Sequence, residues 1–320
     1  MLKKLEEKVL GGKKISKEEA LSITSFSAQD IFVLFSSANR IRHHFRGNTV
    51  DLCAIINAKS GACPEDCSYC AQSARSTAEI KTFQLVEKET ILEKAKKARE
   101  GGAKRFCIVT SGKKASAADL LIIAQMVSAV RELGLLPCAT LGLLSREELL
   151  LLREAGLERY HNNLETSERF FPEICSTHTY QDKVKTIREV QASGLSLCSG
   201  GIFGLGETWE DRIDMAFALR DISPDSVPIN FLTPVKGTRL GVQNLLAPFD
   251  ALKIISLYRF ILPEKEIRVC GGRIQTLSEL HSLIFAAGAD GLLTGDYLTT
   301  LGRNFEADLR LINLCGLTAQ

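Results

Sequence analysis

The feature that most constrains the fold is a strict alternation of strand-like and helix-like segments from Thr49 to the end of the chain. Short β-branched or apolar runs are followed by stretches with helical periodicity, and Gly, Pro or Asn marks the joints. Such alternation implies a parallel sheet with right-handed crossovers. Eight repeats within residues 49–320 favour a closed (β/α)8 barrel, the TIM-type α/β fold, which typically takes about 250 residues. A doubly wound open sheet is the alternative that periodicity alone leaves open.

The predicted elements place any chemistry at one end of this barrel, because active sites of such barrels lie on the loops that follow the strands. The predicted strands are Val50–Asn57, Arg105–Thr110, Leu136–Thr140, Arg159–Asn162, Ser196–Ile202, Ser226–Leu232, Glu266–Cys270 and Gly291–Thr294. The predicted helices between and after them are Thr90–Glu100, Ala117–Leu133, Ser145–Glu154, Gln181–Ala192, Trp209–Leu219, Ala251–Leu262 and Thr276–Ala286. Residues 1–48 are predicted to form an N-terminal helical extension, with helices beginning near Ser16 and Ser27. Residues 49–320 then form a single catalytic domain.

Three cysteines at C-x3-C-x2-C spacing directly follow the first predicted strand: Cys63, Cys67 and Cys70. Thiolates at this spacing can wrap one metal centre from a single loop, and three of them leave one corner of an iron–sulfur cluster open. The spacing alone also allows a zinc knuckle, a disulfide pair with a spare, or buried thiols. The segment resembles the signature of the radical S-adenosylmethionine (SAM) enzymes, in which three cysteines hold a [4Fe–4S] cluster and SAM chelates the fourth iron. Tyr69, the aromatic residue before the last cysteine, is also typical of that superfamily.

The composition favours a cytoplasmic enzyme without a nucleic-acid or membrane partner. The formal net charge is +2 over 320 residues, which gives no basic surface for nucleic acid or an anionic membrane. The charged segment Met1–Lys14 has no apolar core followed by a small-residue cleavage site, and no apolar run reaches the roughly eighteen residues of a membrane span. Ten cysteines without a secretory signal indicate metal or redox chemistry in a reducing compartment.

Five further cysteines fall on predicted strands, where side chains that point inward meet in the barrel lumen. They are Cys53, Cys107, Cys138, Cys198 and Cys270. One cysteine on a strand is commonly a small buried hydrophobic residue, and that explanation weakens for several cysteines that share one lumen. Cys175 and Cys315 lie outside the predicted strands and are predicted to be structural.

Several long stretches resemble the biotin synthase family over nearly the whole chain. They are Lys59–Ser73, Tyr160–Ser167, Leu197–Thr208, Ser226–Leu232 and Val235–Thr238. The resemblance implies a radical SAM barrel, usually a homodimer, that takes electrons from a flavodoxin- or ferredoxin-type reductant. Its reaction inserts sulfur between the methyl and methylene carbons of dethiobiotin to give biotin. Those C–H bonds are unactivated, so acid–base catalysis cannot break them. The cofactors therefore supply the radical chemistry, and the protein orients the substrate and excludes water.

In this family an auxiliary iron–sulfur cluster deep in the barrel is the sulfur donor, with three cysteines and one arginine as ligands. These match Cys107, Cys138, Cys198 and Arg268, which implies a [2Fe–2S] cluster. The chain departs from the family at Cys270, where serine or glycine is usual, and at Cys53, where serine is common. Because side chains at i and i+2 of a strand share a face, Cys270 competes with Arg268 for the fourth ligand position, and Cys53 is a third candidate. A fourth thiolate, with Cys270 favoured, predicts a four-iron auxiliary cluster; the alternative is that both cysteines only replace buried serines.

The resemblance also implies residues that contact SAM and the substrate. The SAM positions match Tyr69, Asn163, Glu165, Lys183, Ile202 and Gly204, and the substrate positions match Asn163 and Asn230. Glu165 is expected on the ribose hydroxyls and Ile202 on the adenine, within a segment that resembles G-x-I-x-G-x-x-E. The amide of Asn230 suits the ureido ring of dethiobiotin, because it offers both a donor and an acceptor.

Two departures qualify these assignments. Lys183 stands at an arginine position near the SAM carboxylate, and lysine lacks the bidentate fork of arginine. The order His161-Asn162-Asn163 replaces the usual Asn-His-Asn, so His161 and Asn162 take no role from the family. Each of these polar residues could instead lie at a strand end, with its side chain hydrogen-bonded to the backbone and no role in binding.

Two other functions stay open at this point. A radical SAM relative with the same barrel, such as the hydrogenase-maturase or methylornithine-synthase relatives, would act on another small substrate and would usually differ at the deeper cysteines and at Asn230. A non-enzymatic iron–sulfur electron carrier would need a fully ligated cluster near the surface and no deep pocket. The three-cysteine motif leaves one cluster position without a protein ligand, which argues against an electron carrier.

Overall fold

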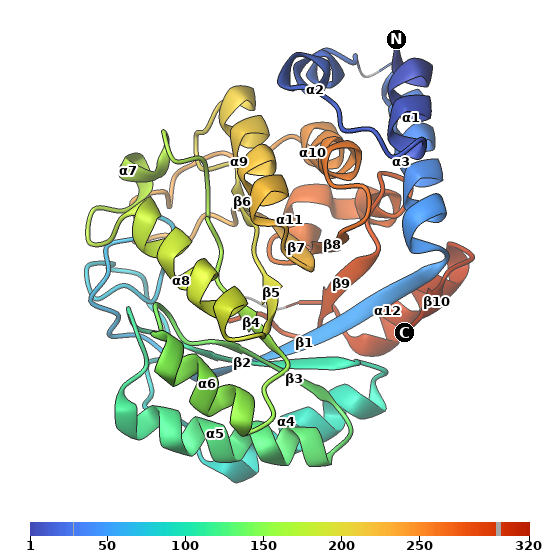
Figure 1. Ribbon diagram of the computed structural model, residues 1–320. Helices are drawn as coiled ribbons and strands as arrows, with labels where there is room; N and C mark the ends of the chain where they lie inside the picture. The colour runs from blue at the N-terminus through green and yellow to red at the C-terminus, as the bar shows by residue number, and fades with distance from the viewer. Residues whose placement is uncertain (28, 299–301) are drawn as a thin grey trace.

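The computed structural model describes residues 1–27, 29–298 and 302–320, and its core is a closed parallel barrel (Figure 1). Eight strand positions follow one another in chain order, each parallel to the next, and the last pairs with the first to close the ring. The (β/α)8 barrel is therefore confirmed, and the open sheet is wrong because closure leaves no unpaired edge. The strands are β1 (Thr49–Lys59), β2 (Arg105–Thr110), β3 (Leu136–Thr140), β4 (Arg159–His161), β5 (Ser196–Cys198), β6 (Gly201–Phe203), β7 (Ser226–Phe231), β8 (Glu266–Val269), β9 (Gly291–Thr294) and β10 (Thr318–Ala319).

Helices surround this barrel on its outer side, as Figure 1 shows. The three N-terminal ones are α1 (Leu2–Leu10), α2 (Lys17–Thr24) and α3 (Ile31–Arg46). The others are α4 (Lys88–Glu100), α5 (Ala117–Glu132), α6 (Arg146–Glu154), α7 (Phe171–Ile174), α8 (Tyr180–Ala192), α9 (Trp209–Ile222), α10 (Pro248–Ile261), α11 (Arg273–Leu277) and α12 (Phe305–Leu314). A 3-10 helix spans Ser278–Ile284. Ala28, in the helix expected to begin at Ser27, lies outside the described residues.

Local capping chemistry fixes where the outer helices begin. Ser145, Thr179 and Thr208 each accept a hydrogen bond from the backbone three residues on, and the acidic residue there bonds back in a capping box. This arrangement satisfies two backbone N–H groups that would otherwise lack partners at the helix start. The loops that lead into α6, α8 and α9 therefore end at defined residues.

The N-terminal helices cover an outer helix that would otherwise expose apolar surface. α10 is buried from Ala251 to Ile261, and a helix that is apolar on every side must be covered on every side. The covering comes from α3 and α2, and α1 packs on α3 in turn. At the other terminus, β10 pairs with the start of β1, so that Thr49 and Thr318 lie opposite each other.

Two predicted elements differ from the structure. The predicted strand Ser196–Ile202 is broken into β5 and β6, because Gly200 lies so close to β7 that a Cβ there would lie 2.0 Å from the carbonyl oxygen of Pro228. Pro228 also has no N–H to donate to the sheet. The predicted helix Thr276–Ala286 is wrong: α11 ends at Leu277, because the φ of 46° at Ser278 breaks the helical path, and a 3-10 helix begins at Ser278.

Across residues 1–27, 29–298 and 302–320, every helix is too short or too polar to cross a bilayer.

Candidate active site

The barrel lumen holds a cavity of about 380 Å³. Residues that begin strands, such as Arg105 of β2 and Arg159 of β4, line its floor, and residues that follow strands line its mouth. Five cysteine thiols line the same cavity: Cys53, Cys107, Cys138, Cys198 and Cys270. The cavity therefore runs from a charged floor through a layer of thiols to a polar mouth.

The loop after β1 carries the three closely spaced cysteines at this mouth. Backbone hydrogen bonds fold it tightly: Ala74 N donates to Cys63 O at 2.7 Å, and Cys70 N donates to Cys67 O at 3.0 Å. All three thiols are free and half-buried. Burial raises the pKa of both Cys63 and Cys70, and the charge of Cys63 adds to the shift at Cys70. The loop thus presents three neighbouring thiols, which is the donor set that an iron–sulfur cluster uses.

Tyr69 and Ala71 of this loop reach the main cavity, which they line. The Tyr69 phenol is buried, and burial raises its pKa well above the ordinary value near 10. The loop therefore closes one side of the mouth with an uncharged aromatic ring, while its cysteines lie beside it.

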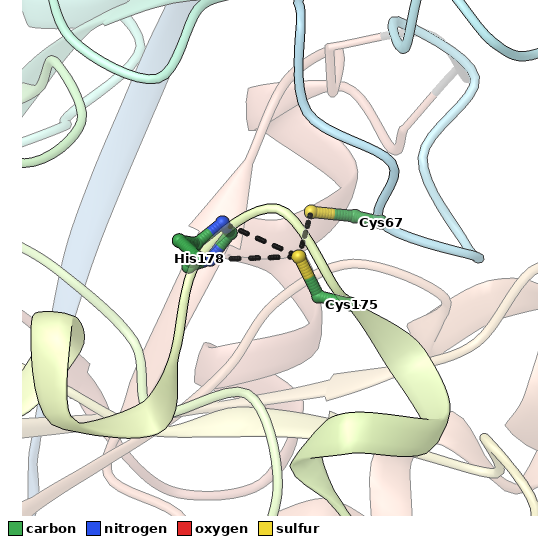
Figure 2. A group of neighbouring side chains, drawn as sticks. All are labelled: Cys67, Cys175 and His178. Atoms are coloured by element: carbon green, nitrogen blue, oxygen red, sulfur yellow. Dashed lines mark hydrogen bonds between the residues drawn. The ribbon is translucent and has the colours of Figure 1, made fainter.

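Cys67 has a partner that sequence reasoning missed. Its Sγ lies 3.9 Å from Sγ of Cys175, which follows α7, and Figure 2 shows both sulfurs beside the His178 ring. The shared hydrogen bond lowers the pKa of Cys175 to about 4 and raises that of Cys67. Cys175 was predicted to be structural; the Cys-x2-His spacing of Cys175 and His178 is the signal that could have marked it.

The deeper thiols come from neighbouring strands. Cys107 and Cys138 stand opposite each other on β2 and β3, and both pack with Cys53 and Cys270 in one apolar cluster. Burial raises the pKa of every lumen thiol: Cys53 and Cys198 to about 11, Cys138 to about 12, and Cys107 and Cys270 well above the ordinary value. These thiols are neutral in the protein alone, and a metal centre would displace their protons.

Arg268 is locked into an ion-pair network beneath the thiols. Its Nη2 lies 2.5 Å from Asp51 Oδ1 and also contacts the Glu266 carboxylate, while its Nη1 donates to Leu292 O at 3.0 Å. Burial acts to lower the pKa of Arg268, but the charges of Glu266 and Asp51 outweigh it and raise the pKa well above the ordinary range. The guanidinium is therefore held protonated, with its donors already engaged.

Further charges complete this floor network. Arg159 lies 3.4 Å from Glu266, and Arg105 lies 3.4 Å from Asp51. Ser226 Oγ donates to Glu266 at 2.7 Å. Burial acts to raise the pKa of Glu266, but Arg268 and Arg159 lower it to about 2. The buried Glu266 carboxylate is thus ionised, and arginines surround both it and the partly buried Asp51 carboxylate.

A chain of hydrogen bonds links the thiol layer to the mouth. Cys107 Sγ lies 3.5 Å from Thr140 Oγ1, which lies 2.9 Å from His161 Nδ1, and His161 Nε2 lies 2.8 Å from Asn163 Oδ1. Asn163 Nδ2 then donates to Glu165 Oε2 at 3.2 Å. The backbone N–H of Gly200 donates to Asn163 Oδ1 at 3.0 Å, so that oxygen is an acceptor.

This fixes the tautomer of His161, because its Nε2 must donate to Asn163 and its Nδ1 must accept from Thr140. Burial lowers the pKa of His161, so the ring is neutral. Alternation along β4 and beyond places Arg159, His161, Asn163 and Glu165 on the cavity wall, with Asn162 off it. This period of two is the signal that could have assigned His161 without the family.

The remaining predicted site residues divide between the cavity wall and its surroundings. Ile202 and Asn230 line the cavity, whereas Lys183 approaches Glu165 from behind, with Nζ 3.7 Å from Oε1. Gly204 lies off the wall and donates its N–H to Glu207 at 3.0 Å. The Asn230 amide donates to Gly201 O at 3.1 Å and accepts from Gly271 N at 3.0 Å. Since an amide has two donors and two lone pairs, one of each stays available.

Comparisons with known proteins cover the whole barrel. The model of the Radical SAM superfamily matches residues 58–219, and that of the Biotin and Thiamin Synthesis associated domain matches residues 228–318. Biotin synthase of Thermodesulfovibrio yellowstonii is 52% identical over 287 residues, which are 90% of this chain and 90% of that protein. Biotin synthase of Geobacter metallireducens is 47% identical over 315 residues, covering 97% of this chain and 95% of that one.

Solved structures share the architecture at low identity. Methylornithine synthase superposes with a TM-score of 0.87 at 23% identity, covering 99% of this chain and 97% of that one. The FeFe-hydrogenase maturase of Carboxydothermus hydrogenoformans gives 0.83 at 17% identity, covering 100% and 79%. At these identities the likeness shows the barrel alone.

Proposed function

The chain belongs to the biotin synthase family of the radical SAM superfamily, and on that premise we propose that it converts dethiobiotin into biotin by inserting sulfur. Membership implies a [4Fe–4S] cluster and SAM as cofactors. When bound, these groups supply the one-electron chemistry that an unactivated C–H bond requires. The observation that carries the proposal is a single lumen with three loop thiols at its mouth and five strand thiols inside it.

The mouth residues fit the [4Fe–4S] cluster and SAM. We assign Cys63, Cys67 and Cys70 as the cluster ligands, because their thiols are free and neighbouring. Glu165 would accept hydrogen bonds from the ribose hydroxyls of SAM. Asn163 and Lys183 contact the Glu165 carboxylate and hold it in place. Those two contacts orient Glu165 before SAM arrives, which reduces the entropy lost on binding.

Ile202 and Tyr69 add apolar walls, which suit the adenine face and exclude water. Gly204 acts through the backbone: with Glu207 as acceptor, it holds the turn that follows Ile202. Its φ of +92° is a conformation that other residues rarely adopt.

The middle of the cavity fits dethiobiotin. The available donor and acceptor of Asn230 match a cyclic urea, and Asn163 provides a second polar contact. A volume of about 380 Å³ lies within the range of about 300–1,000 Å³ common for small-molecule pockets. The substrate would then lie between the mouth and the thiol layer.

The thiol layer fits an auxiliary iron–sulfur cluster, which we propose as the sulfur donor. Cys107, Cys138 and Cys198 are its assigned ligands. Arg268 is a poor fourth ligand, because nitrogen coordination needs a deprotonated guanidinium and the floor carboxylates hold this one protonated. A thiolate is the better iron ligand, and this favours a four-iron cluster over the [2Fe–2S] cluster with arginine.

Two thiols compete for that fourth place. Sequence reasoning favours Cys270, which also lines the cavity. Cys53 lines the same cavity, and both thiols pack with Cys107 and Cys138 in one cluster. We therefore keep Cys270 as the first candidate and Cys53 as the second.

The function is tested with the reconstituted protein, dethiobiotin, SAM and a low-potential reductant under anaerobic conditions. Biotin formation supports the proposal. Formation of 5′-deoxyadenosine without biotin, where a known biotin synthase works in parallel, would contradict it.

The auxiliary cluster is tested by iron and sulfide content together with Mössbauer spectra. Two four-iron clusters give about eight irons per chain, and a [2Fe–2S] partner gives about six. Loss of iron in Cys53→Ser or Cys270→Ser identifies the fourth ligand; about six irons in all chains would support arginine. Arg268→Lys is the arginine variant to use, because it keeps a positive charge beside Glu266 and Asp51.

Two further proposals rest on the family resemblance: a homodimer and a flavodoxin- or ferredoxin-type reductant. The cytoplasmic location rests on the cysteine content, and the division into a helical extension (1–48) and a barrel domain (49–320) rests on the strand–helix alternation. The division is supported by the end of α3 at Arg46 and the start of β1 at Thr49.

A further inference from the structure

We infer that Cys67, Cys175 and His178 form a binding site for a single thiophilic divalent cation, such as Zn²⁺, in the chain that carries no iron–sulfur cluster. The site shares Cys67 with the proposed [4Fe–4S] cluster. It does not depend on which substrate the enzyme uses, so it stands or falls apart from the proposed function.

The three side chains come from two loops that meet at the barrel mouth (Figure 2). Cys67 belongs to the loop after β1, and Cys175 and His178 belong to the segment between α7 and α8. The Cys67 and Cys175 sulfurs are 3.9 Å apart, and Cys175 Sγ lies 3.3 Å from Nδ1 and 3.9 Å from Nε2 of His178. One ligand atom from each residue lies within 4.8 Å of the other two.

These spacings suit tetrahedral zinc. With Zn–S bonds of about 2.3 Å and Zn–N bonds of about 2.0–2.1 Å, tetrahedral angles place neighbouring ligand atoms roughly 3.5–3.8 Å apart. The Cys67–Cys175 and Cys175–His178 Nε2 separations differ from this by a few tenths of an ångström, and the Cys67–His178 separation is within 4.8 Å, so side-chain shifts of about 1 Å or less would complete the site. Two thiolates and one imidazole are also the ligand types that zinc prefers.

The imidazole is oriented as in many zinc sites. Glu65 accepts a hydrogen bond from Nδ1 of His178, which leaves Nε2 free to bind a cation. Thr177 Oγ1 donates to the same Glu65 carboxylate at 2.8 Å, and the His178 ring packs edge-on against Phe171, with centroids 5.6 Å apart. Glu65, Cys175 and His178 are all buried. The arrangement is thus preformed, with a carboxylate behind the histidine.

Asp66 holds the two loops together at this point. Its carboxylate accepts from Ser176 N at 2.9 Å, and its Oδ1 lies 3.3 Å from the Cys175 sulfur. The positive charge of a bound cation would offset this nearby carboxylate. Cys67 is only half-buried, so it gives a cation access to the site.

The site has a consequence for assembly. Cys67 can hold either this cation or the [4Fe–4S] cluster, so the two are mutually exclusive. A cation bound to Cys67, Cys175 and His178 should delay cluster formation on the Cys63–Cys70 loop.

The test uses the full chain, freed of iron by a chelator under anaerobic, reducing conditions. Zn²⁺ affinity is measured against a chromophoric chelator, and Co²⁺ reports thiolate ligation by its sulfur-to-cobalt absorption. We expect one tight equivalent. Cys175→Ser and His178→Ala should each weaken it at least tenfold, and Glu65→Gln should weaken it about 10- to 100-fold, as is typical for such outer-sphere partners.

The controls separate this site from the cysteine loop. Cys63→Ser and Cys70→Ser should keep the affinity, and so should Cys315→Ser, which alters an exposed cysteine. If Cys63→Ser and Cys70→Ser lose the cation while Cys175→Ser and His178→Ala keep it, the loop alone binds it and the inference is wrong. Cys175→Ala is a second variant if Cys175→Ser does not fold, as judged by circular dichroism.

Reconstitution gives an independent measurement. One equivalent of Zn²⁺ added before iron and sulfide should slow the growth of cluster absorbance in the unaltered chain and not in Cys175→Ser. Equal slowing in both chains would overturn the proposed competition for Cys67. Neither measurement uses SAM or dethiobiotin, so an enzyme inactive on dethiobiotin would leave this result intact.

Discussion

Glu266→Gln should destabilise the barrel strongly, because Glu266 is the buried carboxylate that Arg268 and Arg159 share. The side chain keeps its shape but loses its charge, so both guanidiniums stay buried with less compensation. Removing one partner of a buried ion pair typically destabilises by about 3–5 kcal/mol. The pKa of Glu266 gives a second figure: it falls from 4.5 to about 2, and at about 1.4 kcal/mol per unit this corresponds to roughly 3 kcal/mol.

The pH dependence has a definite sign. A carboxylate whose pKa is lowered by folding stabilises the folded state above its unfolded pKa, and that contribution fades as the pH falls through the folded pKa. The difference between the unaltered chain and Glu266→Gln should therefore be full at pH 7 and narrow between about pH 4.5 and pH 2.

Urea unfolding, followed by circular dichroism at pH 7, 5, 4 and 3, measures this difference as a shift of the midpoint. Glu93→Gln is the matched control, because Glu93 pairs with Lys97 on the exposed face of α4, and such surface pairs contribute little. The reasoning is refuted if Glu266→Gln shifts the midpoint no more than Glu93→Gln does, or if its shift is unchanged between pH 5 and pH 3.

The remaining predictions concern the site. Alanine at Cys63, Cys67 or Cys70 should abolish SAM cleavage. Alanine at Cys107, Cys138 or Cys198 should reduce biotin formation more than 5′-deoxyadenosine formation. Equal loss of both products in folded variants of both groups would contradict this division. Asn230→Ala should weaken dethiobiotin binding roughly 5- to 100-fold, from the roughly 1–3 kcal/mol of an unpaired buried polar group, with SAM binding unchanged by calorimetry. His161→Phe should weaken SAM binding by about tenfold, because it removes one of the two donors that hold Asn163, which are His161 and the Gly200 N–H. Unchanged SAM affinity would mean that the chain from Thr140 to Glu165 does not position the Glu165 carboxylate.

Local sequence signals predict much of this barrel. β2, β3 and β9 have the predicted bounds, and most other strands end within two residues of them, because apolar runs flanked by turn residues leave few alternatives. The break between β5 and β6 could not be predicted in the same way. It depends on Gly200 approaching Pro228 of β7, which is a contact between strands.

The site shows the same division. The strand periodicity predicts that thiols meet in the lumen, and the five strand cysteines line one cavity there, while Tyr69 and Ala71 of the cysteine loop line its mouth. Cys175 escaped this reasoning because its partner, Cys67, lies 108 residues away in sequence. The floor network likewise joins Asp51 to Arg268, which is 217 residues away in sequence, and a local sequence pattern cannot predict such a pair.

Arg268 shows why position in a motif does not settle a ligand's role. The arginine occupies the family position, and its side chain lines the cavity. Yet Asp51, Glu266 and the Leu292 carbonyl already engage its donors, and releasing it toward a metal would leave the buried, ionised Glu266 without that partner. In a chain with serine at positions 53 and 270, the cluster would have no other strong ligand at this place. Arginine coordination would then require the free-energy cost of leaving Glu266 without its partner. Here the Cys53 and Cys270 thiols line the same cavity, so under the proposed function Arg268 would keep stabilising the floor while a cysteine completed the proposed cluster.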